Sequence, residues 1–301
     1  MSNLIIVGSV ALDSVKTPFG SVKDALGGAA TYSSYAASFF AKPSIVGVVG
    51  SDFSRQHLQL LQQRGINTDG VEIRKTGNTF RWEGYYEYDL NEAKTVRTEL
   101  GVFADFEPKL PESYRNAEYV FLANIDPELQ LNVIRRMKKP KLVLLDTMNY
   151  WISNKKQQLL EVIGKVDVLL LNDSEARQLF ETPNLVKAAA AALKLGPKYV
   201  IVKKGEHGAL LFSDGSHFSA PGYPLESIKD PTGCGDSFAG ALIGYIAGKS
   251  SNSEKDLRKA IIYGSVIASF NAEDFSLERM KRLTMAEIEK RYSEFEMIRE
   301  F

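Results

Sequence analysis

The sequence is poor in the residues that cross-link small secreted folds or bind structural metals. Cys234 is its single cysteine, so no disulfide can form within the chain. Its three histidines, His57, His207 and His217, lack the spacing of metal ligands, and we expect no structural zinc site. Residues 1–3 carry no charged segment typical of a secretion signal. A single cysteine and no such signal favour a reducing compartment, so we predict a cytoplasmic protein.

The chain also lacks an excess of charge of either sign. Lys and Arg total 37, Asp and Glu total 37, and the formal net charge is zero. Nucleic-acid-binding proteins usually carry a basic excess, so we expect no nucleic-acid partner. No apolar run reaches the roughly 18 residues that a membrane helix needs, so we expect no membrane partner. With 301 residues, 44% of them hydrophobic, the chain is long enough to bury a sizeable core.

Short apolar runs alternate with helix-like stretches along the chain. The runs are continuous in Val, Ile and Leu, as in parallel strands that are covered on both faces. We predict strands at Leu4–Val7, Ile45–Val49, Tyr119–Ala123, Leu142–Leu145, Val168–Leu171 and Tyr199–Val202. We predict helices at Ala29–Ala41, Arg55–Arg64, Pro127–Lys138, Lys155–Ile163, Glu175–Phe180 and Leu185–Leu195. This alternation predicts a doubly wound α/β fold with a mostly parallel sheet, in which ligands lie beyond the carboxyl ends of the strands.

Two segments depart from this alternation. Aromatic and polar residues alternate over Thr79–Asp89, which predicts an exposed antiparallel strand with Thr95–Leu100 as its returning partner. We expect a single α/β domain over 1–301, with a small β-sheet lid formed by about 11–19 and 73–103. A hairpin packed on the core is the alternative. The charged C-terminal stretch, Leu283–Phe301, is predicted to be a surface helix.

The most informative stretch is Asp230–Ala241, which reads DPTGCGDSFAGA. Two glycines flank Cys234 just before a long apolar helix predicted at Ser237–Ala247. The main-chain N–H groups of residues 233–236 are therefore expected to be unpaired donors at a helix start. Free N–H groups and the positive end of the helix dipole form an anion site, and a phosphoryl group in transfer gains most from one.

Asp236 stands directly beside this predicted anion site. An aspartate in the first turn of a helix is usually only a cap. Here the helix behind it is nearly all small and apolar, so its start is expected inside the protein or at the floor of a cleft. A carboxylate next to a bound phosphoryl group can accept the proton of a substrate hydroxyl. We therefore predict that Asp236 is a general base.

Three motifs together resemble the ribokinase/PfkB family of carbohydrate kinases. Residues 230–238 are similar to the family's C-terminal signature, Gly27 and Gly28 before a helix to its di-glycine motif, and Val7–Asp13 to its first strand. The resemblance covers essentially the whole chain in the right order. It implies a ribokinase-like fold and an enzyme that transfers the γ-phosphate of ATP to an alcohol of a sugar-like molecule. It also implies that the enzyme requires Mg²⁺, and it leaves open whether K⁺ activates it. A homodimer formed through the lid is a further expectation from the family.

The resemblance implies a role for each matching position. Asp236 is the implied catalytic base, and Gly233, Cys234 and Gly235 form the implied anion hole. The implied contacts to substrate hydroxyls are Asp13, Gly27 and Gly28. The implied nucleotide site comprises two segments: the N-x-x-E motif of Asn172 and Glu175, and the glycine turn of Lys204, Gly205 and Gly208. Within it, Glu175 is implied to bind Mg²⁺ through water. Asp230 and Thr232 are the implied ligands of a monovalent cation.

Some of these positions have a structural reading of equal weight. Asn172 and Glu175 also fit a helix start with an acidic first turn. Gly205 and Gly208 also fit a hairpin turn between two strands. Further candidates, each of which is as readily a packing residue, are Arg81 and Asn124 for the substrate, Asn271 for the nucleotide, and then Trp82, Tyr86, Tyr88, Asp126, Asp146, Asn149 and Phe275.

The sequence departs from the family in ways that leave the acceptor open. Many related sugar kinases have an asparagine shortly after the di-glycine, whereas residues 29–33 here are Ala, Ala, Thr, Tyr and Ser. A nucleoside kinase of the same fold is therefore the main alternative to a sugar kinase. A non-catalytic regulator is disfavoured because Asp236 is present. A nicotinamide dehydrogenase is a third option, which lacks its fingerprint here because residues 8–13 do not read Gly-x-Gly-x-x-Gly.

Overall fold

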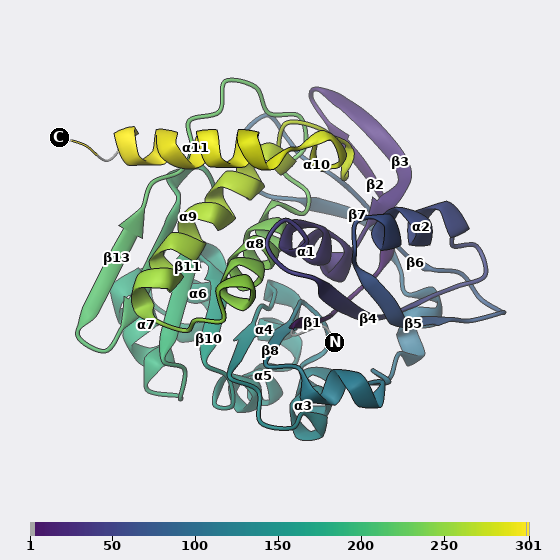
Figure 1. Ribbon diagram of the computed structural model, residues 1–301, viewed down its shortest axis with the longest axis horizontal. Coiled ribbons are helices and arrows are strands. Elements are labelled where there is room, and N and C mark those ends of the chain that lie inside the picture. Colours follow the sequence, from purple (N-terminus) through teal and green to yellow (C-terminus); the bar gives the residue numbers. More distant parts are fainter. Residues whose placement is uncertain (1–3, 299, 301) are drawn as a thin grey trace.

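The computed structural model describes residues 4–298 and 300, and it centres on one large sheet (Figure 1). Our expectation for residues 1–3, and residues 299 and 301 of the predicted C-terminal helix, lie outside this range. The strands of the large sheet are β1 (Leu4–Val7), β4 (Pro43–Val49), β5 (Asn67–Ile73), β8 (Tyr119–Leu122), β9 (Leu142–Leu145), β10 (Val168–Asn172), β11 (Tyr199–Lys203), β12 (Ala209–Ser213) and β13 (Ser216–Ala220).

The large sheet has nine strands in the order β13-β12-β11-β10-β9-β8-β1-β4-β5. Neighbours are parallel from β5 to β11, and β12 and β13 are added antiparallel at one edge. All six predicted strands belong to this parallel part, so the predicted mostly parallel sheet is confirmed. Because strand side chains alternate in direction, Leu4 and Ile6 pack into one core cluster and Ile5 and Val7 into another on the opposite face.

Helices cover both faces of the large sheet, as the sequence predicted (Figure 1). They are α1 (Ala29–Ala37), α2 (Arg55–Gln63), α3 (Pro127–Arg136), α4 (Asn149–Asn154), α5 (Lys156–Ile163), α6 (Asp173–Phe180), α7 (Leu185–Leu193), α8 (Cys234–Lys249), α9 (Glu254–Asn271), α10 (Glu278–Arg282) and α11 (Met285–Ile298). Short 3₁₀ turns occupy Gly101–Asp105, Glu112–Asn116 and Gly205–His207. α1 ends four residues before its predicted end at Ala41, because the chain turns there and Phe40 N–H donates to Ala37 O at 3.0 Å.

A second, four-stranded sheet stands beside the large one. It comprises β2 (Ala11–Thr17), β3 (Gly20–Gly27), β6 (Phe80–Tyr85) and β7 (Lys94–Glu99), in the order β3-β2-β6-β7. β6 and β7 are antiparallel, as predicted, and β6 also pairs in parallel with β2. Strands come from both segments assigned to the lid, 11–19 and 73–103, and β3 is an addition to them. The lid function and the homodimer through this sheet stay predictions.

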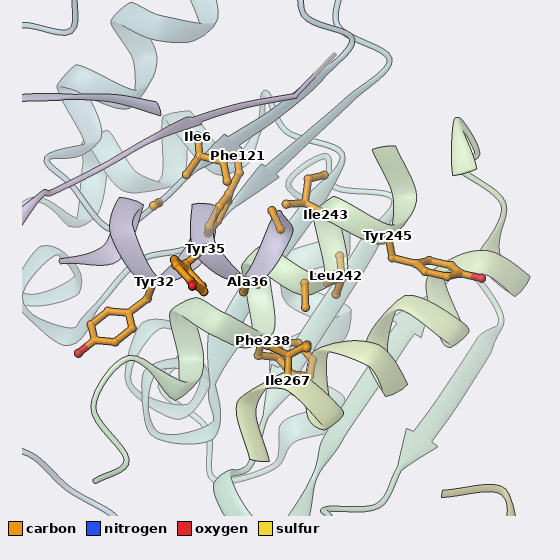
Figure 2. Close-up of a cluster of buried hydrophobic side chains, with 14 of the residues drawn as sticks. Ile6, Tyr32, Tyr35, Ala36, Phe121, Phe238, Leu242, Ile243, Tyr245 and Ile267 are labelled. Carbon is orange, nitrogen blue, oxygen red and sulfur yellow. The ribbon is translucent and has the colours of Figure 1, made fainter. Parts of the chain in front are cut away.

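Helices α1 and α8 pack against each other through glycines. A Cβ on Gly240 would lie 2.0 Å from Ser33 O, and one on Gly244 would lie 2.7 Å from Ala37 Cα. Because both contacts advance in the same direction along the two helices, α1 and α8 run parallel. Their N-termini therefore lie at the same end of the molecule. This packing, part of which Figure 2 shows, brings the di-glycine motif and the 230–238 loop together.

Candidate active site

The loop before α8 presents main-chain N–H groups at the start of a helix. Gly233 caps α8 in the left-handed conformation, with a φ of 75°. Within the described residues, the N–H groups of Gly233, Gly235 and Asp236 have no hydrogen-bond acceptor. The N–H of Cys234 instead donates to Pro231 O at 3.1 Å, which corrects our expectation that it is a free donor. The donors available to the predicted anion hole are therefore the N–H groups of Gly233, Gly235 and Asp236.

Two of the predicted residues hold this loop in place. The Asn271 side chain donates from Nδ2 to Thr232 O at 2.8 Å and accepts from Ser237 Oγ at 3.2 Å. The Cys234 thiol donates to Ala268 O at 3.4 Å. Burial raises the pKa of this thiol to about 12, so it stays protonated and is no nucleophile. Asn271 and Cys234 thus brace the anion hole from behind.

The Asp236 carboxylate lies in the first turn of α8 and accepts no hydrogen bond from another described residue. Its pKa is raised to about 7: burial contributes most, the charge of Asp146 adds to the rise, and Lys203 opposes both. A pKa near neutrality suits a general base, because the carboxylate is available and still a strong enough acceptor. The alternative of a helix cap is not supported, since the cap position is Gly233 and the carboxylate bonds no main-chain N–H.

Lys203, which we did not predict, places a positive charge beside the anion hole. It ends β11, and its Nζ lies 3.1 Å from Oδ1 and 3.3 Å from Oδ2 of Asp146, the residue after β9. A Cβ on Gly235 would lie only 3.3 Å from the same Nζ. Burial lowers the pKa of Lys203, but Asp146, Glu175 and Asp236 raise it more, so it stays charged. Asp146 was a candidate because ligands of such sheets lie beyond the carboxyl ends of the strands. Lys203, at the end of β11, meets the same criterion.

Asn172 and Glu175 form a reciprocal cap at the start of α6. Asn172 Oδ1 accepts from Glu175 N–H, and Glu175 Oε2 accepts from Asn172 N–H, each at 2.7 Å. The helix-start reading is therefore confirmed. Burial raises the pKa of Glu175 to about 7, and the nearby charges of Lys203 and Asp146 place it in the same cluster as the anion hole.

These carboxylates fit the needs of Mg²⁺. Mg²⁺ prefers oxygen ligands, keeps several waters and binds through one or two carboxylates together with substrate phosphates. Over residues 4–298, no three His, Cys, Asp or Glu side chains are close enough to hold a metal directly. A site with few protein ligands, such as Glu175 and Asp146 beside the predicted anion hole, matches that behaviour. Binding of Mg²⁺ by Glu175 through water stays a prediction.

Asp13 lies on the substrate side, next to the di-glycine motif. Gly28 N–H donates to Asp13 Oδ2 at 3.3 Å, and a Cβ on Gly27 would lie 1.9 Å from the same oxygen. Only glycine at position 27 leaves space for this carboxylate. Burial raises the pKa of Asp13 to about 7, and the charges of Asp236 and Asp230 contribute. The fold thus joins Asp13 and Asp236 in one electrostatic cluster although they lie near opposite ends of the chain.

The remaining residues of the predicted nucleotide and cation sites form two turns. Gly205 and Gly208 have positive φ and lie in the turn between β11 and β12, where Lys204 N–H donates to Gly208 O at 2.7 Å. The hairpin reading is confirmed, since β11 and β12 are antiparallel. Asp230 Oδ1 accepts from Thr232 N–H at 2.9 Å. Contacts of either turn with nucleotide or K⁺ stay predictions.

Several other candidates are engaged within the protein. Arg81 forms ion pairs with Asp24 and, at 2.7 Å, with Asp52. Asn124 accepts from Trp151 Nε1 at 2.9 Å. Further contacts are those of Asp126 with Lys155 at 2.7 Å, of Trp82 Nε1 with Thr95 Oγ1 at 3.1 Å, and of the Phe275 ring with Gly20. Asn149 begins α4, and Tyr88 is 82% exposed. Substrate contacts from Arg81 and Asn124 stay predictions.

Tyr86 links the small sheet to the anion-hole loop. It follows β6, and its hydroxyl accepts from Thr232 Oγ1 at 3.4 Å. Burial raises its pKa and the charges of Asp230 and Asp13 add to the rise, so the phenol stays protonated. The small sheet therefore already contacts the loop that carries the anion hole.

Two of the three carboxyls with a pKa of about 7, Asp13 and Asp236, predict how activity depends on pH. Protonated Asp236 cannot accept a proton and protonated Asp13 loses its charge, so kcat/KM should fall as pH drops through about 7. Because the two carboxyls interact, the low-pH side of the kcat/KM profile (the acid limb) reports their joint titration. It should be steeper than the profile of a single group. The measurement is ADP release between about pH 5 and 9 with saturating MgATP. Asp13→Asn should make the limb shallower, and a flat profile down to about pH 5 would contradict the assignment.

Comparison with known proteins identifies the family. Residues 4–280 match the family described as pfkB family carbohydrate kinase. The chain belongs to the PfkB family. It is accordingly a kinase that transfers phosphate from ATP to an alcohol group, and its resemblance to this family is confirmed. ATP and Mg²⁺ are the expected cosubstrate and metal of a PfkB kinase.

Individual relatives of this PfkB kinase are named for nucleosides. It is 33% identical over 257 residues to a cytidine kinase of Thermococcus kodakarensis, covering 83% of this chain and 90% of the relative. It is 26% identical over 269 residues to a nucleoside kinase of Thermoplasma acidophilum, covering 89% and 82%. Its fold is similar to the crystal structure of the Methanocaldococcus jannaschii nucleoside kinase, a member of the ribokinase family, with a TM-score of 0.77, 21% identity and coverage of 97% and 98%.

The fold comparison confirms the ribokinase-like α/β class predicted from sequence. No helix within residues 4–298 has the length and apolar character needed to cross a membrane.

Proposed function

We propose that this PfkB kinase phosphorylates a nucleoside, on the primary 5′-hydroxyl of its ribose. The observation that carries the proposal is that relatives named cytidine kinase and nucleoside kinase align over 83% and 89% of the chain. The departure after the di-glycine supports it, since Tyr32 stands among the positions where related sugar kinases carry an asparagine. The ribose of a nucleoside offers a vicinal diol for Asp13 and a primary alcohol for Asp236.

Asp236 acts on the attacking hydroxyl. Its carboxylate accepts the proton of the 5′-hydroxyl, and the oxygen forms a bond to the γ-phosphorus in line with the departing ADP. The bond between the γ-phosphorus and the β,γ-bridging oxygen breaks, and ADP leaves with its electron pair. The N–H groups of Gly233, Gly235 and Asp236 donate to the transferring phosphoryl oxygens. Mg²⁺, when bound, neutralises charge on the phosphates.

A panel of acceptors tests the proposal. Cytidine, uridine, inosine, adenosine, ribose and fructose are each offered with MgATP, and ADP release is measured together with the mass of the product. We expect at least one nucleoside to give a kcat/KM roughly tenfold or more above that of free ribose, because the base adds contacts that ribose lacks. The same panel with Asp236→Asn controls for contaminating kinases. A free sugar as the best acceptor would contradict the proposal and favour the sugar-kinase alternative.

A further inference from the structure

The Tyr32 side chain spans the substrate side and the anion hole. It lies in the first turn of α1, where its N–H donates to Gly28 O at 3.1 Å. Gly28 N–H in turn donates to Asp13 Oδ2 at 3.3 Å. At its other side the ring packs on Gly233, where a Cβ would lie 2.5 to 2.6 Å from three ring carbons. Tyr32 is thus fixed between the residue that orients Asp13 and the cap of α8.

The Tyr32 hydroxyl has no partner, although the residue is almost completely buried. Only 2% of Tyr32 is exposed, and its hydroxyl bonds no residue within 4–298. Its oxygen is not among the fully enclosed polar atoms that lack a partner, so it keeps a small accessible surface at which a ligand hydroxyl can pair with it. Figure 2 shows the hydroxyl pointing away from the apolar side chains around Tyr35 and Ala36. The apolar core therefore does not receive it.

Carboxylates surround this phenol without bonding it. Burial, followed by the charges of Asp13, Asp230 and Asp236, raises the pKa of Tyr32, so the hydroxyl keeps its proton and is a donor. The carboxylates are close enough to act on the phenol, yet none is at hydrogen-bond distance. Within residues 4–298, no side chain bridges the Tyr32 hydroxyl and Asp13, whose carboxylate accepts from Gly28 N–H. A hydroxyl fits there, because it accepts from the phenol and donates to the carboxylate.

We propose that Tyr32 is a specificity-determining residue whose phenol donates a hydrogen bond to one secondary hydroxyl of the acceptor's ribose, while that hydroxyl donates to Asp13. The inference rests on the proposed function for the identity of the ribose. An acceptor without this hydroxyl leaves the Tyr32 phenol and one oxygen of Asp13 unpaired in a buried site. Sites of this kind reject such analogues strongly. The kinase is therefore expected to prefer ribonucleosides over the corresponding deoxynucleosides.

Tyr32→Phe tests this role with matched acceptors. For wild type and variant, kcat and KM are measured with the preferred nucleoside and with its 2′-deoxy and 3′-deoxy analogues. The preference for the nucleoside over one of the two analogues should fall roughly tenfold in Tyr32→Phe, mainly through KM. The matched control is Tyr35→Phe, also on α1 and 3% exposed, whose ring packs near Phe39 and Arg64 instead. Tyr35→Phe should keep the wild-type preference.

Two results would overturn the inference. One is an unchanged preference in Tyr32→Phe for both analogues. The other is a parallel loss for all acceptors together with a lower melting temperature or a higher KM for ATP, which indicates a purely structural role. If the panel identifies a free sugar as the acceptor, the same ratios are measured with that sugar and its deoxy analogues. Failure of the nucleoside proposal therefore leaves the role of Tyr32 open to its own test.

Discussion

Replacing Asp236 by asparagine is expected to reduce kcat by roughly 10²- to 10⁴-fold, the usual contribution of a general base. The amide cannot accept the hydroxyl proton, while the main-chain donors of Gly233 and Gly235 and the Lys203 charge stay in place. ATP affinity should therefore change little. Turnover and the dissociation constant of MgATP are measured on the same preparation. The control is Asp256→Asn, which alters an aspartate in the first turn of another helix, α9.

The same substitution is expected to stabilise the protein at neutral and alkaline pH. Burial raises the pKa of Asp236 from 3.8 to about 7, so the folded state binds its proton more tightly than the unfolded state. Stability is therefore lost as pH rises from about 4 to 7, by at most about 4 kcal/mol for this group. Asparagine removes that cost, so the melting temperature of the variant should exceed that of wild type at about pH 8 and approach it in acid.

Joint loss of activity and gain of stability separates a catalytic from a structural aspartate. If Asp236 instead held α8 in place, its replacement would lower both turnover and the melting temperature. Normal turnover in Asp236→Asn would remove this carboxylate from the mechanism. Reduced turnover with a lower melting temperature at about pH 8 would show that its burial is favourable after all.

The sequence was most informative where apolar runs are continuous and motifs are local. Leu142–Leu145 is a buried strand because four consecutive aliphatic residues can be covered on both faces. Gly233 was a candidate because glycines mark places where the main chain must turn or be approached closely. Asp236 was a candidate because it stands beside that turn at the start of an apolar helix, and Asp13 and Gly28 came from the family resemblance. These features depend on short stretches, so they can be read before the fold is known.

The features that were missed depend on contacts between distant segments. Helix α9 was not predicted because it is buried on most sides from Leu257 to Asn271, which weakens the amphipathic period. β3 was not predicted because its exposed polar residues, such as Lys23, owe their conformation to main-chain pairing with β2. The unpaired phenol of Tyr32 follows from the packing of α1 on α8, which no local pattern reveals.

Lys203 carries the second large expected effect, because it is the counter-charge of a buried carboxylate. Lys203→Met leaves Asp146, whose side chain is 6% exposed, without its charged partner. Breaking a buried ion pair from one side costs about 3–5 kcal/mol, so the melting temperature should fall markedly. Turnover should fall as well, because the ammonium group beside Gly235 is lost from the place where phosphoryl charge develops.

The double variant Lys203→Met/Asp146→Asn separates stability from catalysis. It removes both buried charges, so most of the lost melting temperature should return. The pH profile supplies the decisive reading. Lys203 lowers the pKa of Asp236 and Asp146 raises it, so the acid limb should move to higher pH in Lys203→Met and back toward wild type in the double variant. If turnover stays low in the double variant at saturating Mg²⁺ while the limb returns, the loss reflects the missing charge at the predicted anion hole. A limb that does not move in Lys203→Met would show that the ammonium group does not act on Asp236.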